Sequence, residues 1–269
     1  MCVLSCNNNR NIATWGELLT TRAQYLKAAG CLVDGCIRDS KAIKIMKFPI
    51  FSNGTNPVDT KFRGKMIIAD TLDSFGYHKQ AVYTTIHSLD SELVLCGFAR
   101  TGIYMPIYHD DENTNVYEHE LALIDSLLEG EVCVLSCNNN RNIAPWGELL
   151  TTRAKYLKAA GCLVDGCIRD SKAIKKMKFP IFSNGTNPVD TKFRGKMIFS
   201  DVPAEVGGVL INTGDLIFGD QDGVVSIPSK LINQVVEKSF QKVSSENTVR
   251  KELNEGQSLK EVFIKHGIL

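Results

Sequence analysis

Arg169 and Asp170 follow the apolar run Cys162–Val164, which predicts the start of a buried strand. A carboxylate such as that of Asp170 is a ligand that Mg²⁺ or Mn²⁺ prefers. The planar guanidinium of Arg169 has the shape to bind a substrate carboxylate through two parallel hydrogen bonds. Glu148, about twenty residues earlier, can hold a metal-bound water or act as a base. These residue types are compatible with divalent-metal chemistry on a carboxylate-bearing substrate.

Each of these residues also has an ordinary structural role that the sequence leaves open. Asp170 can cap the amino end of a predicted helix at Ser171–Lys178. Arg169 can form an ion pair at the surface, and Glu148 suits the first turn of a helix because the helix dipole favours a negative charge there. The residues alone do not decide between the two sets of roles.

The elements that must position these side chains are a helix and the strand after it. Pro145 suits the first helical position, the helix continues through Tyr156, and Gly161 is a natural left-handed cap. In α/β folds, ligands gather at the carboxyl ends of strands and the amino ends of helices. The groups expected to meet there are Gly147, Glu148, the backbone amides of Leu149 and Leu150, Arg169 and Asp170.

Three stretches, Trp146–Leu150, Val164–Asp170 and Phe179–Gly185, together resemble the RraA-like family. This family includes the divalent-metal-dependent class II aldolases that act on 4-hydroxy-4-methyl-2-oxoglutarate and 4-carboxy-4-hydroxy-2-oxoadipate. The resemblance covers roughly residue 69 to the C-terminus. It implies a swivelling α/β domain with a layered mixed sheet. It also implies retro-aldol cleavage of a 4-hydroxy-2-oxo acid to pyruvate, with decarboxylation of oxaloacetate as a related reaction.

The resemblance also implies a role for each site residue. Asp170 and Glu148 would hold Mg²⁺ or Mn²⁺, and Arg169 with Glu148 would be catalytic. Gly147, the amides of Leu149 and Leu150, and Arg169 would bind the small 2-oxo acid substrate. A third metal-site carboxylate, Glu246, would reach the site of a neighbouring subunit, so a homo-oligomer, a trimer or hexamer, is expected.

A second hypothesis comes from the same family, because some RraA relatives are non-enzymatic regulators that bind a ribonuclease. Such regulators often lack the aspartate that follows the arginine. The presence of Asp170 therefore favours the enzyme.

Composition excludes several other classes of function. The formal net charge of the 269 residues is +1, so no basic field predicts binding to nucleic acid. No apolar run approaches the length of a bilayer span, and the N-terminus lacks a signal-peptide pattern, so a cytoplasmic protein without a membrane contact is expected. The nine cysteines do not form the CxxC pairs of zinc or redox sites, and those in the apolar strand are expected to behave as small hydrophobic residues.

The chain contains a long internal repeat, because residues 2–70 recur as residues 133–201 with five differences. The differing pairs are Thr14/Pro145, Gln24/Lys155, Ile45/Lys176, Ile68/Phe199 and Ala69/Ser200. The first copy predicts a strand, a helix and two further strands, but no complete sheet. A recent partial duplication and an error in the gene model would both produce this pattern. We therefore divide the chain into residues 1–68, a partial duplicate of 132–199, and residues 69–269, the RraA-like aldolase domain.

The second copy is expected to fill the working domain, because it is joined directly to the elements before and after it. Glu17, Arg38 and Asp39 of the first copy would then be idle, and its open strand edges would favour aggregation or swapping.

Simple patterns predict the remaining elements. An amphipathic helix ending at Gly130 is predicted from a stripe of four residues, and the three closely spaced strands near the C-terminus are expected to pair antiparallel. The stripe comprises Tyr117, Leu121, Ile124 and Leu128, and the strands are Gly207–Ile211, Asp215–Phe218 and Gly223–Ile227. A helix capped by Gly76, strands at Leu93–Phe98 and Val132–Ser136, a helix from Ser229 and a capping box at Ser258–Glu261 complete the prediction.

Overall fold

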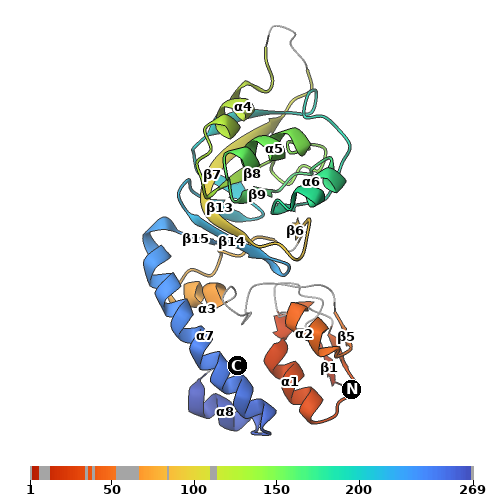
Figure 1. Cartoon of the computed structure of the whole chain (residues 1–269), viewed down its shortest axis with the longest axis vertical. Helices are drawn as coiled ribbons and strands as arrows, with labels where there is room; N and C mark the ends of the chain where they lie inside the picture. Colours follow the sequence, from red (N-terminus) through yellow and green to blue (C-terminus); the bar gives the residue numbers. More distant parts are fainter. Residues whose placement is uncertain are drawn as a thin grey trace. The chain divides into compact units, whose positions relative to one another are not determined.

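A computed structural model describes residues 2–5, 13–33, 36–37, 40–52, 67–83, 85–109 and 114–267 (Figure 1). The chain separates into two compact units. The sheet unit comprises Lys79–Ile232, and the duplicate unit comprises Met1–His78 together with Asn233–Leu269. Arg38 and Asp39 lie outside the described residues.

The sheet unit is built on one mixed sheet, which has eight strands in its described part. Its main path runs in the order β15-β14-β7-β8-β9-β10-β6, and β11 pairs with the far end of the long strand β7. The strands β7, β8, β9 and β10 are parallel, and the outer pairings are antiparallel. The bounds are β6 (His87–Ser88), β7 (Leu95–Pro106), β8 (Glu131–Ser136), β9 (Gly161–Val164), β10 (Ile181–Ser183), β11 (Gly195–Ser200), β14 (Leu216–Asp220) and β15 (Gly223–Ile227).

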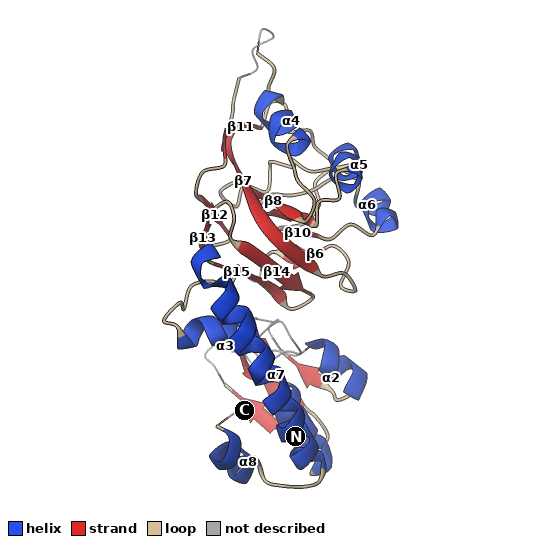
Figure 2. Cartoon of the chain, turned by 60° about the vertical axis from the view of Figure 1, so that its left-hand side comes forward, coloured by secondary structure: helices blue, strands red, loops and turns tan. Residues whose placement is uncertain are grey.

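Three helices cover one face of this sheet, as Figure 2 shows: α4 (Glu118–Asp125), α5 (Glu148–Tyr156) and α6 (Ser171–Met177). Because successive side chains of a strand point to opposite faces, Cys133 and Leu135 of β8 join the core under the helices. Val132 and Val134 of the same strand join a second core on the other face. A hairpin of β12 (Ala204–Val206) and β13 (Val209–Ile211) contributes to that second core. The expected mixed α/β fold with a layered sheet is confirmed.

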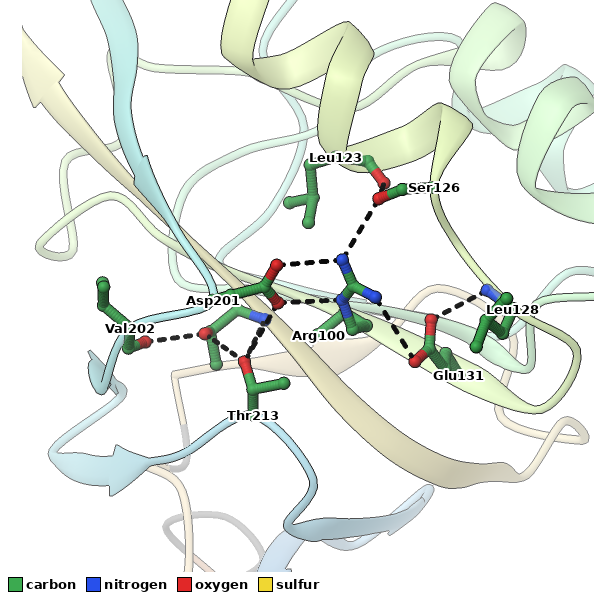
Figure 3. Close-up of polar contacts among 9 residues, drawn as sticks. Arg100, Leu123, Ser126, Leu128, Glu131, Asp201, Val202 and Thr213 are labelled. Carbon is green, nitrogen blue, oxygen red and sulfur yellow. Dashed lines mark hydrogen bonds and ion pairs between the residues drawn. The ribbon is translucent and has the colours of Figure 1, made fainter.

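A charged cluster joins three strands of the sheet unit at the end of β8 away from its carboxyl terminus (Figure 3). Arg100 of β7 donates to Asp201, which follows β11, at 2.9 Å, and to the hydroxyl of Ser126 at 3.1 Å. Glu131 of β8 lies 3.7 Å from the same guanidinium. The cluster therefore anchors β11 at the edge of β7 with charge-assisted hydrogen bonds.

The duplicate unit repeats part of the sheet unit on a smaller scale. Its strands β1 (Cys2–Leu4), β3 (Cys31–Val33) and β5 (Ile50–Phe51) form a parallel three-stranded sheet in the order β1-β3-β5. The helix α1 (Glu17–Tyr25) follows β2 (Ala13–Trp15), and α2 (Ser40–Met46) follows β4 (Cys36–Ile37). The predicted strand, helix and two further strands of the first copy are thus present as β1, α1, β3 and β5.

The duplicate unit also contains three helices that are not part of the repeat's α/β pattern. They are α3 (Ile67–Ser74), α7 (Ile232–Asn254, which begins one residue before the unit) and α8 (Leu259–His266). The Ser258 hydroxyl accepts from the Glu261 amide and the Glu261 carboxylate accepts from the Ser258 amide, so the predicted capping box is confirmed. The helix predicted from Ser229 continues without a break through Glu246 as α7.

Several sequence-based expectations about local structure are confirmed. The predicted strand Val132–Ser136 is β8, the run Cys162–Val164 lies in β9, and β14 pairs antiparallel with β15. The strand predicted at Leu93–Phe98 extends further, to Pro106. The described cysteines are free, and burial raises the pKa of thiols such as Cys162, which keeps them neutral and hydrophobic. No helix among the described residues is both long and apolar enough to cross a membrane.

Two predicted helix boundaries are wrong. Helix α5 begins at Glu148 with Gly147 as its N-cap, so Pro145 lies in the preceding loop. The left-handed residue after the helix is Lys158 (φ 60°), and Gly161 is the first residue of β9. Gly161 serves close packing there, because a Cβ would approach the Pro180 carbonyl oxygen to 2.5 Å. The three C-terminal strands also differ from the prediction in one pairing, since β13 pairs with β12.

The predicted apolar stripe of α4 is only partly correct. Ile124 is buried as predicted, but Leu121 and Leu128 are exposed, and the other buried positions include Glu120, Leu123 and Leu127. The helix also ends at Asp125, before Gly130. A pattern of apolar residues alone does not include the buried Glu120, so it misplaces the inner face of the helix.

Candidate active site

The site lies beyond the carboxyl ends of the parallel strands, where the two predicted segments meet. Single β-bridges join Ile168 to Trp146 on one side and to Thr186 on the other. The amide of Arg169 donates to the Trp146 carbonyl at 2.9 Å. The start of α5 and the Arg169–Asp170 pair are therefore held side by side by backbone hydrogen bonds, as fold logic predicted.

Gly147 makes the close approach of these segments sterically possible. A Cβ at this position would lie 2.8 Å from Asp170 Oδ2 and 3.0 Å from Arg169 Cγ. Its φ of −149° is extended and suits any residue, so the requirement for glycine is one of space. The next amide, that of Glu148, donates to Asp170 Oδ2 at 3.1 Å. The amino end of α5 thus stabilises the negative charge of Asp170.

Asp170 has an unusual backbone for a non-glycine residue, with φ 58° and ψ 29°. It occupies the N-cap position of α6, and its carbonyl accepts from the amides of Ala173 and Ile174. Among the residues that the structure describes, its carboxylate makes no capping hydrogen bond to that helix. The side chain accepts from the amino end of α5 instead. The alternative in which the Asp170 carboxylate caps α6 is therefore wrong.

Arg169 is held by a carboxylate that the sequence analysis did not single out. Its Nη1 lies 3.0 Å from Asp190 Oδ2, and its Nε lies 4.0 Å from Asp170 Oδ2. Tyr117, before α4, donates its hydroxyl to Asp190 Oδ1 at 2.6 Å. The ion pair considered as an alternative therefore exists, and it leaves Arg169 partly exposed beside Asp170.

The charges around Asp190 reinforce one another. Burial alone would raise the pKa of Asp190, but hydrogen bonds from Tyr117 and the Lys192 amide, together with Arg169, lower it to about 2. Burial and the bond to Asp190 raise the pKa of Tyr117 to about 12. Burial lowers the pKa of Arg169, and the two aspartates more than offset this and raise it. Tyr117 stays protonated and Asp190 stays charged at neutral pH, so the Asp190 carboxylate accepts from both the Tyr117 hydroxyl and the Arg169 guanidinium.

A buried acid lies near this network. Glu120 of α4 is buried in the core, and its burial raises its pKa to about 7. The nearby hydroxyl of Tyr104 opposes that rise, and the charge of Asp190 adds to it. The sequence contained a signal for Glu120, because a helix whose inner face includes positions 123, 124 and 127 must also turn position 120 inward.

Asp165 is a second acid that sequence reasoning missed. It is buried, accepts from the amides of Cys137 and Asn139, and its carbonyl accepts from the side-chain amide of Asn184. Burial raises its pKa. Asn139 has φ 56°, as expected for this asparagine-rich loop. Asp165 therefore connects the loops after β8, β9 and β10 and supports the site without opening onto it.

An open depression of about 760 Å³ lies at the amino end of α5 and along α6. Its lining consists of Glu148, Asp170, Ser171, Lys172, Ala173, Lys176 and Met177. Two carboxylates and two lysines thus face one shallow space. Of the predicted binding residues, Leu149 exposes its side chain and Leu150 packs partly against the core.

Only part of the predicted metal site is assembled in the sheet unit. Asp170 and Glu148 line the same depression, whereas Glu246 is buried on α7 in the duplicate unit. Among the described residues, no group of three histidine, cysteine or acidic side chains is close enough to bind one ion. Two carboxylates remain compatible with Mg²⁺, which keeps several waters and commonly takes one or two protein carboxylates. The room that Gly147 leaves for Asp170 Oδ2 also fits such a ligand.

The fold and this site define a class of mixed α/β proteins with an acidic, arginine-bearing site at the carboxyl ends of parallel strands. A family model described as RraA-like, Aldolase/RraA, matches residues 1–68 and again residues 65–226. These matches cover most of the chain, and the protein belongs to the RraA-like family.

Two curated relatives are similar to parts of the chain. Protein DlpA of Legionella pneumophila is 28% identical over 194 residues, which are 72% of this chain and 31% of that protein. A protein of Halalkalibacterium halodurans, provisionally named a 4-hydroxy-4-methyl-2-oxoglutarate aldolase, is 39% identical over 125 residues, which are 45% of this chain and 59% of that protein. The chain thus matches less than two thirds of the length of either relative.

A solved structure shares the fold. It is RraAS2 of Streptomyces coelicolor, described as an unusual member of the RNase ES inhibitor RraA protein family. The TM-score is 0.62 at 27% identity, and the match covers 70% of this chain and 91% of that one.

Proposed function

We propose that this protein is a divalent-metal-dependent carbon–carbon lyase that cleaves a 4-hydroxy-2-oxo acid to pyruvate. The observation that carries the proposal is the contact set around Gly147. There the Glu148 amide, the Asp170 carboxylate and the Arg169 guanidinium lie within a few ångströms of one another. The name of the Halalkalibacterium halodurans relative supports the same reaction.

The proposed metal ligands are Asp170 and Glu148, which line the same depression, with Mg²⁺ or Mn²⁺ as the ion. When bound, the ion would supply a Lewis acid for the 2-oxo group of the substrate. Glu246 is proposed as a further carboxylate, contributed by a neighbouring subunit of a homo-oligomer.

The chain's own residues would bind the substrate by its carboxylate. The amides of Leu149 and Leu150 lie in the first turn of α5, where backbone N–H groups have no partner within the helix. They and Arg169 provide donors for a carboxylate and for the charge that develops on the 2-oxo oxygen. The Tyr117–Asp190 pair fixes the guanidinium of Arg169 in that position.

The reaction needs one proton acceptor, and we assign that role to Glu148. It would take the proton of the C4 hydroxyl as the bond between C3 and C4 breaks. The electron pair of that bond would form the C2–C3 double bond of an enolate while the carbonyl pair moves to the 2-oxo oxygen, and the pair left by the O–H bond would form the carbonyl group of the second product. The proton held by Glu148 would then return to C3 and complete pyruvate. Decarboxylation of oxaloacetate would pass through the same enolate and would not need the C4 proton acceptor.

The test measures pyruvate release from 4-hydroxy-4-methyl-2-oxoglutarate and from oxaloacetate, with Mg²⁺, with Mn²⁺ and with a chelator. We expect release with either metal and its loss in chelator. Full activity in chelator, or the absence of pyruvate from both substrates with both metals, would overturn the proposal.

The likeness to the Streptomyces coelicolor structure supports a second candidate, a regulator that binds a ribonuclease. That function predicts no pyruvate release and inhibition of a ribonuclease at stoichiometric concentration. Assays of pyruvate release and of ribonuclease inhibition on one protein preparation therefore distinguish the two candidates.

A further inference from the structure

The depression beside the candidate site carries two lysines that have no role in the mechanism above. Lys172 and Lys176 of α6 line it together with Glu148 and Asp170. The two lysines are four residues apart, so their side chains lie on the same face of the helix. Both are exposed, and neither forms an ion pair or a hydrogen bond with another residue in the described part of the chain. Their ammonium groups are therefore available to a ligand.

This pair of lysines is unfavourable for the helix itself. Like charges at positions i and i+4 repel one another and destabilise a helix. The first copy avoids the repulsion, because its helix α2 has Ile45 where α6 has Lys176. Ile45 is 75% exposed, so no packing contact decides which residue stands at this position. The second copy thus has a charge repulsion that the fold does not require and that a bound anion would offset.

Another charge difference between the two copies has a structural explanation. Lys155 of α5 donates to the Met177 carbonyl of α6 at 2.6 Å, and its counterpart Gln24 of α1 donates to the Met46 carbonyl of α2 at 2.7 Å. Both side chains join the same two helices in the same way (Figure 1). Lys155 therefore keeps a contact that the first copy also has, whereas Lys176 does not replace any such contact.

The charges of the depression indicate which kind of ligand it would take. The two lysines offset the carboxylates of Glu148 and Asp170, so a divalent cation on those carboxylates would leave a surplus of two positive charges. A ligand with two carboxylates would neutralise this surplus, and a monocarboxylate would neutralise half of it. The lining follows α6 from Ser171 to Met177, a rise of about 9 Å at 1.5 Å per residue. The lysines can therefore reach a carboxylate that is remote from the amino end of α5.

We propose that Lys172 and Lys176 form a subsite for a second carboxylate, at the end of the substrate remote from its 2-oxo acid group, and that Lys176 determines the preference for dicarboxylates over monocarboxylates. The proposal rests on the function proposed above, which places the 2-oxo acid group at the amino end of α5. An ammonium group on a flexible stem suits a carboxylate whose position changes with the length of the substrate. Ala173 and Met177 would contact the carbon chain between the two ends.

The principal experiment measures binding and does not depend on cleavage. The ligands are 2-oxoglutarate and 2-oxopentanoate, which have the same number of carbon atoms and differ in the second carboxylate. Neither has the C4 hydroxyl that retro-aldol cleavage needs. Calorimetric titration of the full chain in Mg²⁺ gives a dissociation constant for each ligand. We expect 2-oxoglutarate to bind about tenfold more tightly, as two exposed charge pairs allow.

Three variants of Lys176 test its part in this preference. Lys176→Ile installs the residue of the first copy and should reduce the preference about threefold to fivefold. Lys176→Gln should have the same effect and keeps the position polar, so the measurement stands even if the isoleucine variant is poorly soluble. Lys176→Arg retains the charge and should keep most of the preference.

Lys175→Ile is the matched control on the same helix. Lys175 is exposed and does not belong to the lining of the depression, and the first copy has a lysine, Lys44, at the same position. This variant should keep the preference within about twofold of that of the unmodified chain. The preference of the unmodified chain should also weaken as the salt concentration rises, because salt screens exposed charges.

The proposal is wrong if the unmodified chain binds the two ligands equally or binds neither. It is also wrong if Lys176→Ile and Lys175→Ile reduce the preference equally. Its failure is distinguishable from failure of the proposed reaction. A chain that prefers 2-oxoglutarate through Lys176 but releases no pyruvate has the subsite without the lyase activity. A chain that releases pyruvate while Lys176→Ile leaves the preference unchanged has the lyase activity without the subsite.

Discussion

The two copies of the repeat show what 69 nearly identical residues do in two surroundings. In the first copy the Trp15 indole donates to Thr20 at 2.8 Å, and in the second the Trp146 indole donates to Thr151 at 2.8 Å. The first tryptophan stacks on Phe48 at 6.4 Å between ring centroids, and the second stacks on its counterpart at 6.2 Å. Local contacts follow the sequence closely, because both partners lie within the repeat.

Burial differs where the partners lie outside the repeat. Leu163 of β9 is fully buried against β12, β13 and β14, whereas its counterpart Leu32 of β3 is 45% exposed. The first copy ends before the sequence that supplies those strands. Its three-stranded sheet therefore buries one face only, and a sheet of this size gains little stability from one buried face.

The end of the repeat changes secondary structure altogether. Ile67 and Ile68 begin helix α3, whereas the corresponding Ile198 and Phe199 lie in strand β11. β11 pairs with β7, and Asp201 binds Arg100 at its end. Tertiary pairing, which the first copy lacks, outweighs the weak propensity of a four-residue segment.

The largest expected effect separates the copies by activity. Asp170→Ala should reduce pyruvate release by about a hundredfold or more, since even residues that only support a metal ligand commonly contribute 10–100-fold. Asp39→Ala, the same change in the first copy, should leave the rate within about twofold, a spread we set as the error of the assay. Initial rates with Mg²⁺ measure both. Full activity of Asp170→Ala, or loss of activity in Asp39→Ala, would reverse the assignment of the working copy.

A matched pair of core changes tests the difference in burial. Leu163→Ala should destabilise the sheet unit by about 2–5 kcal/mol, the usual range for a fully buried leucine. Leu32→Ala should cost under about 1 kcal/mol, because much of the Leu32 side chain stays in water. Urea titrations followed by tryptophan fluorescence compare the two. An equal loss of unfolding free energy in the two variants would show that another surface covers Leu32 in solution.

The buried acid on α4 has no counterpart in the first copy and predicts a pH effect. The folded-state pKa of Glu120, about 7, is above its ordinary value of 4.5, so the unfolded chain loses this proton first as the pH rises. The contribution of Glu120 to stability is therefore greatest below about pH 4, falls between about pH 4 and 7, and is then constant, with a total loss of roughly 3 kcal/mol.

Glu120→Gln should remove that pH dependence from urea titrations at pH 5 and pH 8. Glu118→Gln, on the exposed face of the same helix, is the control and should retain it. The interpretation fails if the two variants show the same slope.

A smaller effect concerns the support of Arg169. Tyr117→Phe removes the hydroxyl that donates to Asp190 and should raise the KM for the 2-oxo acid about fivefold, the equivalent of about 1 kcal/mol, with kcat nearly unchanged. Tyr108→Phe, at an exposed position, is the control. A change in kcat without a change in KM would indicate that Tyr117 takes part in the chemistry.

The smallest expected effect is that of removing the first copy. A chain that begins at Ile67 should keep the activity of the full chain, because Glu148, Arg169 and Asp170 all lie in the sheet unit. Loss of activity on truncation, together with loss in Asp39→Ala, would identify the first copy as the working one.

The sequence by itself determined the elements that depend on neighbours along the chain. The strands β8 and β9, the helix between them, the capping box of α8 and the approach of Glu148 to Asp170 were predicted from apolar runs, caps and spacing. The family resemblance predicted the mixed α/β fold. These features rest on short-range interactions or on the general geometry of parallel strands.

Only the tertiary structure decided which residues distant in sequence complete the site. Asp190 binds Arg169 because two loops distant in sequence converge there. The tertiary structure also decided the different burial of the nearly identical helices α1 and α5, since Leu18 is covered by α7 and α8 and Leu149 is exposed. Identical sequences carry identical local preferences, and burial depends on which other surfaces reach them.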